Sequence, residues 1–181
     1  MFETIKKCIK EAVRKIEETE HFVSILPEVG TNIVMSPPEA TSLSEVVALT
    51  GRIIKVENRA VGVGEPKSGA STYMGTVLLS AKKRDRRISA AINIKYSEGI
   101  LNTCKELKIE PQTFLWDIKP KEAVEFKCTI PWTIEKLGKV PEIVYDIGDF
   151  GVEASMIIFG KTAIEVADKA IIIATHYAKN G

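Results

Sequence analysis

The chain has 181 residues and a mass of 20.0 kDa, a size that suits one domain with a sizeable core. Apolar residues make up 45% and charged residues 27%, a balance typical of a globular protein and not of a disordered or fibrous one. With 25 Lys and Arg against 24 Asp and Glu, the net charge of +1 argues against a nucleic-acid or membrane-surface partner. Three widely spaced cysteines give no disulfide framework and no zinc spacing, and they favour a reducing, cytoplasmic setting.

The first expected element is an amphipathic helix over residues 2–20. Its apolar residues recur at helical spacing, namely Ile5, Ile9, Val13 and Ile16. We divide the chain into residues 1–20, a linker helix, and residues 21–181, the domain proper. The helix is either the connector from an upstream domain or the first layer of this one.

A turn flanked by strands is expected over residues 24–34, because Pro27 and Gly30 interrupt two β-rich runs. Glu28 and Asn32 supply the polar groups of this turn and are candidate substrate-binding residues. Next, the segment SLSE over residues 42–45 matches a capping box, which predicts a short helix that ends at residues 50–51.

Two β-rich runs, 52–56 and 59–63, are separated by two residues only, a length that suits a tight hairpin and excludes a crossover helix. Part of the sheet is therefore antiparallel. Periodicity and a second capping box predict the remaining elements, which are helices at 71–81, 97–107 and 162–177 and strands at 88–94, 113–118, 142–146 and 155–159. This mixture predicts a layered α/β domain with a mixed sheet.

The segment GVGEPKSGASTY, residues 62–73, is the most informative stretch. A strand leads through a glycine-rich loop into a helix, so backbone amides at the helix start point toward a phosphate-sized anion, namely those near Gly69, Ala70 and Ser71. Arg52 opens the hairpin and its guanidinium can grip phosphate oxygens in pairs. The segment matches neither the P-loop nor the dinucleotide fingerprint, and it reads equally well as a plain turn beside a solvated arginine.

Two further groups of polar residues follow strands. Asp146 and Asp149, in the segment YDIGDFG, can hold Mg²⁺ together with substrate phosphates, or they can simply form a turn. Asn93 and Lys95 alternate with isoleucines, so both project from one face of the sheet, either into a site or toward water. No HExxH, GxSxG or kinase signature occurs, which argues against those hydrolase and kinase classes.

Several blocks, in this order, resemble the archaeal ThiN-type thiamine-phosphate synthase domain, namely LPEVGTNIV, GRIIKV, VGVGEPKSGAS, AAINIKYSE, IPW and YDIGDFG. The resemblance extends from about residue 26 to the C-terminus. It implies a three-layer α/β/α sandwich with a mixed, mostly antiparallel sheet, similar to class II aldolases. In that family the domain is commonly fused to an upstream phosphomethylpyrimidine kinase, from which residues 1–20 would then lead in.

The resemblance also implies an activity, the joining of hydroxymethylpyrimidine diphosphate to hydroxyethylthiazole phosphate to give thiamine phosphate and diphosphate. Its partners would be these two small molecules, with Mg²⁺ accompanying the diphosphate, while the sequence leaves a homo-oligomer open. We expect Arg52 and Tyr73 to act in catalysis. Candidate substrate-binding residues are Glu28, Asn32, Gly69, Ala70, Ser71, Asn93 and Lys95, and candidate metal ligands are Asp146 and Asp149.

Tyr73 departs from the family pattern, because synthases of this family look like they carry a His at this position after GAS. A phenol with an ordinary pKa near 10 is a poor substitute for imidazole in proton transfer. A second hypothesis is therefore a module that binds thiamine phosphate without turnover, as in relatives that carry a DNA-binding helix-turn-helix. A third, an aldolase-like sugar-phosphate enzyme, needs a metal held by several histidines, and this chain has two distant ones.

Overall fold

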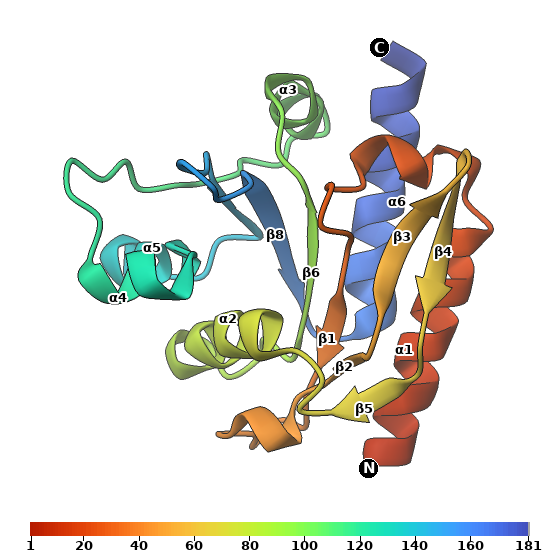
Figure 1. The fold of residues 1–181 in the computed structure, drawn as a ribbon, viewed down its shortest axis with the longest axis horizontal. Coiled ribbons are helices and arrows are strands. Elements are labelled where there is room, and N and C mark those ends of the chain that lie inside the picture. Colours follow the sequence, from red (N-terminus) through yellow and green to blue (C-terminus); the bar gives the residue numbers. More distant parts are fainter. Residues whose placement is uncertain (181) are drawn as a thin grey trace.

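A six-stranded sheet in the order β5-β2-β1-β6-β8-β7 forms the centre of the domain in the computed structural model, which describes residues 1–180 (Figure 1). In sheet order the strands are β5 (Pro66–Ser68), β2 (Val47–Leu49), β1 (Ile33–Met35), β6 (Ala90–Lys95), β8 (Ser155–Gly160) and β7 (Ile143–Asp146). Every ladder between them is antiparallel. Within residues 1–180 the single parallel pairing is an isolated bridge between Gln112 and Val144.

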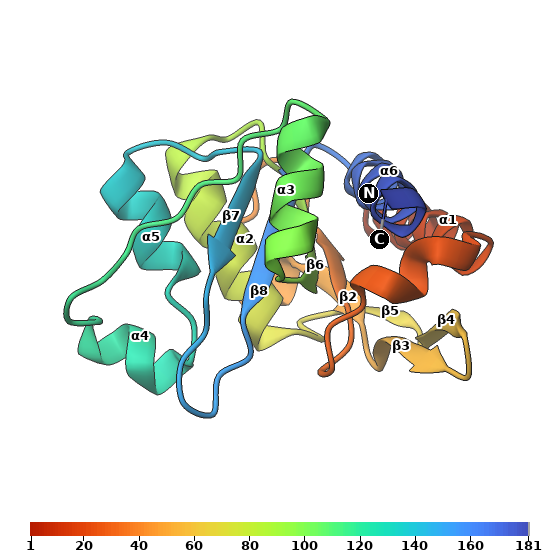
Figure 2. The same ribbon diagram turned by 90° about the horizontal axis from the view of Figure 1, so that it is seen from above.

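Helices cover both faces of this sheet (Figure 2). One face carries α1 (Phe2–Glu17), the 3-10 helix η1 (Glu20–Ile25), α3 (Glu98–Glu106) and α6 (Ala163–Asn180). The other carries α2 (Thr72–Arg84) and α5 (Ile130–Leu137), with the short α4 (Lys121–Phe126) beside α5. The predicted three-layer sandwich with a mostly antiparallel sheet is thus confirmed.

The central strands β6 and β8 separate two apolar cores, because successive side chains of a strand point to opposite faces. Ile92 and Ile158 pair across the strands and pack under α6, while Ala91 and Phe159 pair and pack under α2. Both faces are buried, which explains why these strands read as nearly continuous apolar runs in the sequence.

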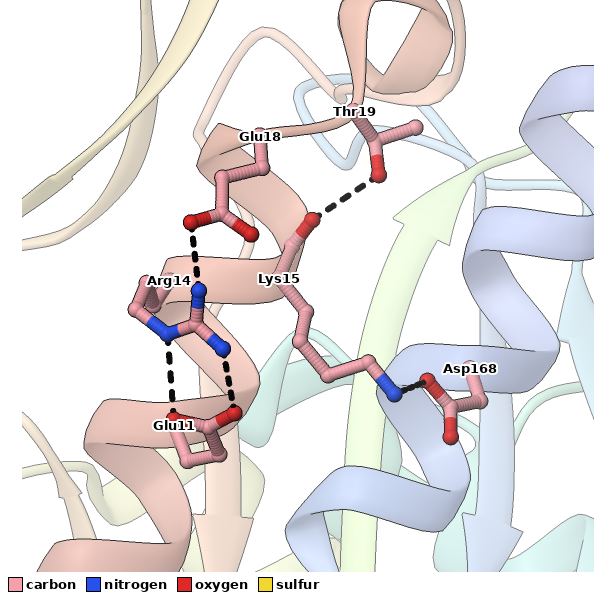
Figure 3. A network of polar contacts seen from close by, with 6 residues as sticks. All are labelled: Glu11, Arg14, Lys15, Glu18, Thr19 and Asp168. Atoms are coloured by element: carbon pink, nitrogen blue, oxygen red, sulfur yellow. Dashed lines mark hydrogen bonds and ion pairs between the residues drawn. The ribbon is translucent and has the colours of Figure 1, made fainter.

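Helix α1 belongs to the helical layer of this domain. One stripe of it is buried against α6 and the sheet, namely Ile5, Ile9, Ala12, Val13 and Ile16. Figure 3 shows its outer side, where Arg14 bridges Glu11 and Glu18, and where Lys15 forms an ion pair with Asp168 of α6. Such exposed pairs contribute little, so the buried stripe supplies most of the attachment.

None of the helices formed by residues 1–180 has the length and apolar character needed to cross a bilayer.

The predicted hairpin forms with the expected bounds, β3 (Arg52–Val56) and β4 (Arg59–Val63), as a separate two-stranded sheet beside α1. Its turn places Glu57 at a φ of 53°. The predicted helices at 71–81, 97–107 and 162–177 correspond to α2, α3 and α6, and the strands at 88–94, 142–146 and 155–159 correspond to β6, β7 and β8.

Three local predictions are wrong. The capping box at Ser42 forms, with the Glu45 carboxylate accepting from the amides of Thr41 and Ser42, but only the 3-10 helix η2 (Leu43–Glu45) follows it. The next residues, rich in valine, instead join the sheet as β2, because pairing with β1 and β5 outweighs local helix propensity.

The other two errors concern expected strands. Of residues 24–34, the first part lies in η1 and its continuation, which bury Phe22 and Ile25, and only the end becomes β1. Residues 113–118 form no strand, because only Gln112 reaches the edge strand β7, and Leu115 and Ile118 stay exposed. Three further elements, β5, α4 and α5, carry no pattern from which they were predicted.

Candidate active site

A cavity of about 240 Å³ opens where the segment before β1, the start of β3, the N-terminus of α2 and the loop before β8 meet. Five predicted site residues line it, namely Asn32, Arg52, Ser71, Tyr73 and Asn93. It also has lining residues that the sequence analysis did not single out, including Gly30, Met74, Lys127, Glu153 and Ser155. A larger hollow of about 500 Å³ lies between α2 and α5, but none of the predicted site residues lines it.

Arg52 reaches this cavity from a strained backbone. Its φ is 97°, a conformation that residues with a Cβ rarely adopt and that costs about 1–3 kcal/mol. The strain arises at the crossing of two segments, since Thr31 pairs with Ile53 directly after Arg52. The guanidinium of Arg52 donates to the carbonyl of Val29 and is exposed. The predicted cation is therefore held at the rim of the cavity.

Gly30 is required at the same crossing. Its φ is 81°, and a Cβ added to it would lie 3.0 Å from the carbonyl oxygen of Ile53. A side chain at this position would therefore push the cavity wall away from the hairpin that carries Arg52.

Asn32 and Asn93 line the cavity, but their side-chain amides are hydrogen-bonded to the backbone. Asn93 Oδ1 accepts from the Asn32 amide at 2.7 Å, and Asn93 Nδ2 donates to the Gly30 carbonyl at 3.1 Å. Asn32 Nδ2 and Oδ1 pair in turn with the carbonyl and amide of Leu49 at 3.1 and 3.2 Å. Because both side chains are buried, these bonds replace ladder pairings and fix the segment that carries Gly30.

The N-terminus of α2 forms another wall. Ser71 is the N-cap, and its Oγ accepts from the Met74 amide at 3.3 Å, while the remaining amides of the first turn have no acceptor within the helix. The expected cradle is smaller than predicted, because the Gly69 amide donates to the Val46 carbonyl at 2.8 Å and is not free. Ala70 packs against the apolar core beneath α2 and does not line the cavity.

Tyr73 lies in the first turn of α2, where its ring stacks on Phe126 with centroids 5.7 Å apart. Burial raises the pKa of its phenol well above the ordinary value, and the neighbouring Cys128 thiol raises it further. The pKa of Cys128 is itself raised to about 11 by burial. Tyr73 thus offers a neutral hydroxyl and an aromatic surface to the cavity, and no base that titrates near pH 7.

Two charged residues missed by sequence reasoning complete the lining. The carboxylate of Glu153 accepts from the amides of Glu28 and Val29 at 2.7 and 3.1 Å, which ties the loop before β8 to the segment before Gly30. Glu28 therefore takes part through its backbone, and its side chain does not line the cavity. Lys127, an exposed residue at the end of α4, also lines the cavity.

The carboxylates of Asp146 and Asp149 act as turn formers in this structure. Buried Asp146 accepts from the amide and hydroxyl of Thr129 and from the Gly148 amide, and exposed Asp149 pairs with Lys119 at 3.2 Å. Within residues 1–180 no group of three or more His, Cys, Asp or Glu is arranged to hold a metal ion. Both carboxylates are thus engaged by protein donors, and both residues line an adjoining hollow of about 180 Å³. Lys95 is exposed and lies outside the cavity.

The cavity joins an electropositive rim to an apolar and aromatic wall. Arg52, Lys127 and the first turn of α2 favour an anion such as a phosphate, and Tyr73 and Met74 favour a flat ring. The fold that carries this cavity is shared with l-fuculose-1-phosphate aldolase from Thermus thermophilus, with a TM-score of 0.53 at 9% identity over 97% of this chain and 94% of that one. This likeness defines the class of fold, an aldolase-like α/β/α domain.

The family follows from closer comparisons. The family model of thiamine-phosphate synthase ThiN matches residues 8–172, so the chain belongs to the ThiN family, an enzyme family of thiamine biosynthesis. It is 29% identical to thiamine-phosphate synthase ThiN of Methanothermobacter thermautotrophicus over 93% of this chain and 92% of that protein. It is also 37% identical to the bifunctional thiamine biosynthesis protein ThiDN of Methanocaldococcus jannaschii over 85% of this chain, and this match spans 37% of that longer protein.

Solved structures agree with this assignment. The C-terminal domain of protein MJ0236 superposes with a TM-score of 0.88 at 33% identity, over 99% of this chain and 98% of that one. The C-terminal domain of a phosphomethylpyrimidine kinase gives 0.83 at 30% identity, over 96% and 100%. The resemblance seen in the sequence is thereby confirmed.

Proposed function

We propose that the protein joins hydroxymethylpyrimidine diphosphate to hydroxyethylthiazole phosphate. The bond between the pyrimidine methylene and the diphosphate oxygen breaks, and diphosphate leaves with the electron pair. The thiazole nitrogen donates its lone pair to the methylene carbon, which forms the C–N bond of thiamine phosphate. A kinase, on this chain or on another, must supply the pyrimidine diphosphate.

This proposal rests on Arg52, whose backbone has a φ of 97° and which lines the cavity together with the N-terminus of α2. Negative charge gathers on the departing diphosphate in the transition state, and preorganised donors at that point lower the barrier. Arg52 and the amides after Ser71 are such donors. Because strain is retained where the surrounding structure enforces it, the backbone of Arg52 supports a functional role for its side chain.

The remaining lining residues position and shield the reactants. Tyr73 and Met74 provide a flat apolar wall for a heteroaromatic ring, and the hydroxyls of Tyr73 and Ser155 can hydrogen-bond to ring nitrogens. The cavity, at about 240 Å³, lies slightly below the 300 Å³ at which ligand sites typically begin. We expect Mg²⁺ to arrive bound to the diphosphate, because Asp146 accepts from Thr129 and Gly148 and Asp149 pairs with Lys119.

The direct test is to incubate the protein with both precursors, with and without Mg²⁺, and to quantify thiamine phosphate and diphosphate. Equimolar formation of both products supports the proposal. An Arg59→Ala variant serves as a matched control, because Arg59 opens the other strand of the hairpin and does not line the cavity. No product under any of these conditions, from protein shown to be folded, contradicts the proposal.

The burial of Tyr73 favours a second candidate, a module that binds thiamine phosphate without turnover. Its phenol, with a strongly raised pKa, cannot replace an imidazole in proton transfer. Calorimetry with thiamine phosphate separates the two functions. Binding without turnover in the wild-type protein, together with turnover in a Tyr73→His variant, supports the binding module, and turnover in the wild type excludes it.

A further inference from the structure

We infer that Lys127 is an anion-binding residue of the cavity, which it reaches from the side of α4 as Arg52 does from the hairpin. This inference rests on the proposed function of the same cavity, and it concerns a segment in which the sequence shows no motif. Three features of Lys127 support it, which are its backbone conformation, its lack of an ion-pair partner and its position between two hollows.

The backbone of Lys127 occupies a position that normally requires glycine. Lys127 ends α4 with φ 54° and ψ 39°, its amide donates to the Val124 carbonyl, and the next amide, that of Cys128, donates to the Ala123 carbonyl. These bonds form the left-handed helix end in which glycine is strongly favoured. Helix α5 ends in the same left-handed conformation and carries Gly138 there. A lysine at the corresponding position of α4 therefore costs stability.

A similar cost occurs at Arg52, and the two positions meet in one cavity. Residues 1–180 contain four non-glycine residues with positive φ, namely Arg52, Glu57, Lys108 and Lys127. Glu57 lies in the hairpin turn and Lys108 follows α3, and neither lines the cavity. The two that do line it, Arg52 and Lys127, are the two basic residues of its lining. Strained backbone conformations cluster at functional sites, where they place a side chain that function requires.

The charge of Lys127 is also left without a protein partner. Its neighbours Lys119 and Lys121 pair with Asp149 and Glu125 at 3.2 and 3.8 Å. No ion pair to Lys127 or to Arg52 forms within residues 1–180. Glu153, the carboxylate on the same wall, is occupied by two backbone amides. Those amides are neutral, so Glu153 keeps its negative charge, and an anion in the cavity would meet two cationic residues against one carboxylate.

Lys127 further lies at the boundary of two hollows. Together with Val152 it lines both the cavity and an adjoining hollow of about 180 Å³ beneath the loop that carries Phe150. Asp146 and Asp149 also line the adjoining hollow, and their carboxylates disfavour a phosphate there, so we place the anion on the cavity side of Lys127. The ligand chemistry that fits is a diphosphate or a phosphate monoester.

The test is calorimetric titration of the protein with inorganic diphosphate and, separately, thiamine phosphate. Lys127→Gly removes the charge and the strained Cβ, and Lys127→Gln removes the charge at similar length. We expect both variants to bind diphosphate at least tenfold more weakly, and Lys127→Arg to stay within about threefold. Because glycine removes the strain of the left-handed conformation at this helix end, Lys127→Gly should not lower Tm and is expected to raise it by about 2–4 °C.

Lys108→Gly is the matched control, since it relieves the same kind of helix end outside the cavity and should leave diphosphate affinity unchanged. Wild-type affinity in Lys127→Gln and Lys127→Gly overturns the inference, while the proposed function stands if the wild type still forms thiamine phosphate. A wild type that binds neither ligand overturns both.

Discussion

Replacing Arg52 separates the stability of the protein from its function. Arg52→Ala keeps the strained φ of 97° and loses the bond to the Val29 carbonyl, so we expect a loss of about 1 kcal/mol in unfolding free energy. Arg52→Gly loses the same bond and about 0.5–1 kcal/mol through unfolded-chain entropy, but it recovers about 1–3 kcal/mol of strain. The glycine variant should therefore be more stable than the alanine variant by about 1 kcal/mol, which reverses the usual order.

Urea denaturation followed by circular dichroism measures this difference, and calorimetry measures the binding of inorganic diphosphate. Both variants should lose about 1.5–3 kcal/mol of binding free energy, roughly 10- to 150-fold in affinity, because both lack the guanidinium. Arg59→Ala should change neither quantity appreciably. An alanine variant as stable as the glycine variant would show that the backbone of Arg52 carries no strain, and unchanged diphosphate affinity would make Arg52 an ordinary surface charge.

Three further predictions concern Asn93 and Tyr73, which line the cavity, and Cys128, which neighbours Tyr73. Asn93→Ala should lower the unfolding free energy by about 3 kcal/mol, because it leaves the buried amide of Asn32 and the buried carbonyl of Gly30 unpaired. The control Asn102→Ala, on the exposed side of α3, should cost less than about 0.5 kcal/mol. Equal effects of the two substitutions in urea denaturation would refute this prediction. Burial raises the pKa of Cys128 from 9.0 to about 11, so the folded state holds the thiol proton more tightly than the unfolded chain does. The resulting contribution to the unfolding free energy is fully present below pH 9 and is lost as the pH rises toward 11. Between pH 8 and 10.5 the wild type should lose about 2 kcal/mol more than Cys128→Ala, and identical pH profiles in urea would contradict the assignment. Tyr73→Phe should keep the stack on Phe126 and bind thiamine phosphate within about fivefold of the wild type, because it removes at most one neutral hydrogen bond. A hundredfold loss of affinity would instead show that the phenol contacts the ligand strongly.

Elements bounded by local chemistry could be predicted from the sequence. The hairpin follows from a two-residue connection, and α2, α3 and α6 follow from apolar periodicity and from caps such as Ser71 and Ser97. Arg52 could be placed near the anion-favouring loop because it opens the hairpin that leads into it, whereas Tyr73 was singled out by the family resemblance. These predictions needed only interactions between residues close in the sequence.

What the sequence analysis missed depends on contacts between distant segments. The Gly69 amide looks free in the sequence, but it pairs with Val46 once β5 joins the sheet. The amide of Asn93 is occupied by backbone more than 60 residues away, at Gly30 and Asn32. Lys127 follows a short helix with no motif, and only its left-handed conformation, which the sequence does not reveal, marks it out.

We propose that the cavity between Arg52 and α2 receives the phosphate end of thiamine phosphate. A crystal structure of the protein with thiamine phosphate tests this most directly. We predict phosphate density within hydrogen-bond distance of the Arg52 guanidinium and the first-turn amides of α2, with a ring beside Tyr73. Thiamine phosphate bound instead in the hollow between α2 and α5, with this cavity holding only water, would refute this binding site.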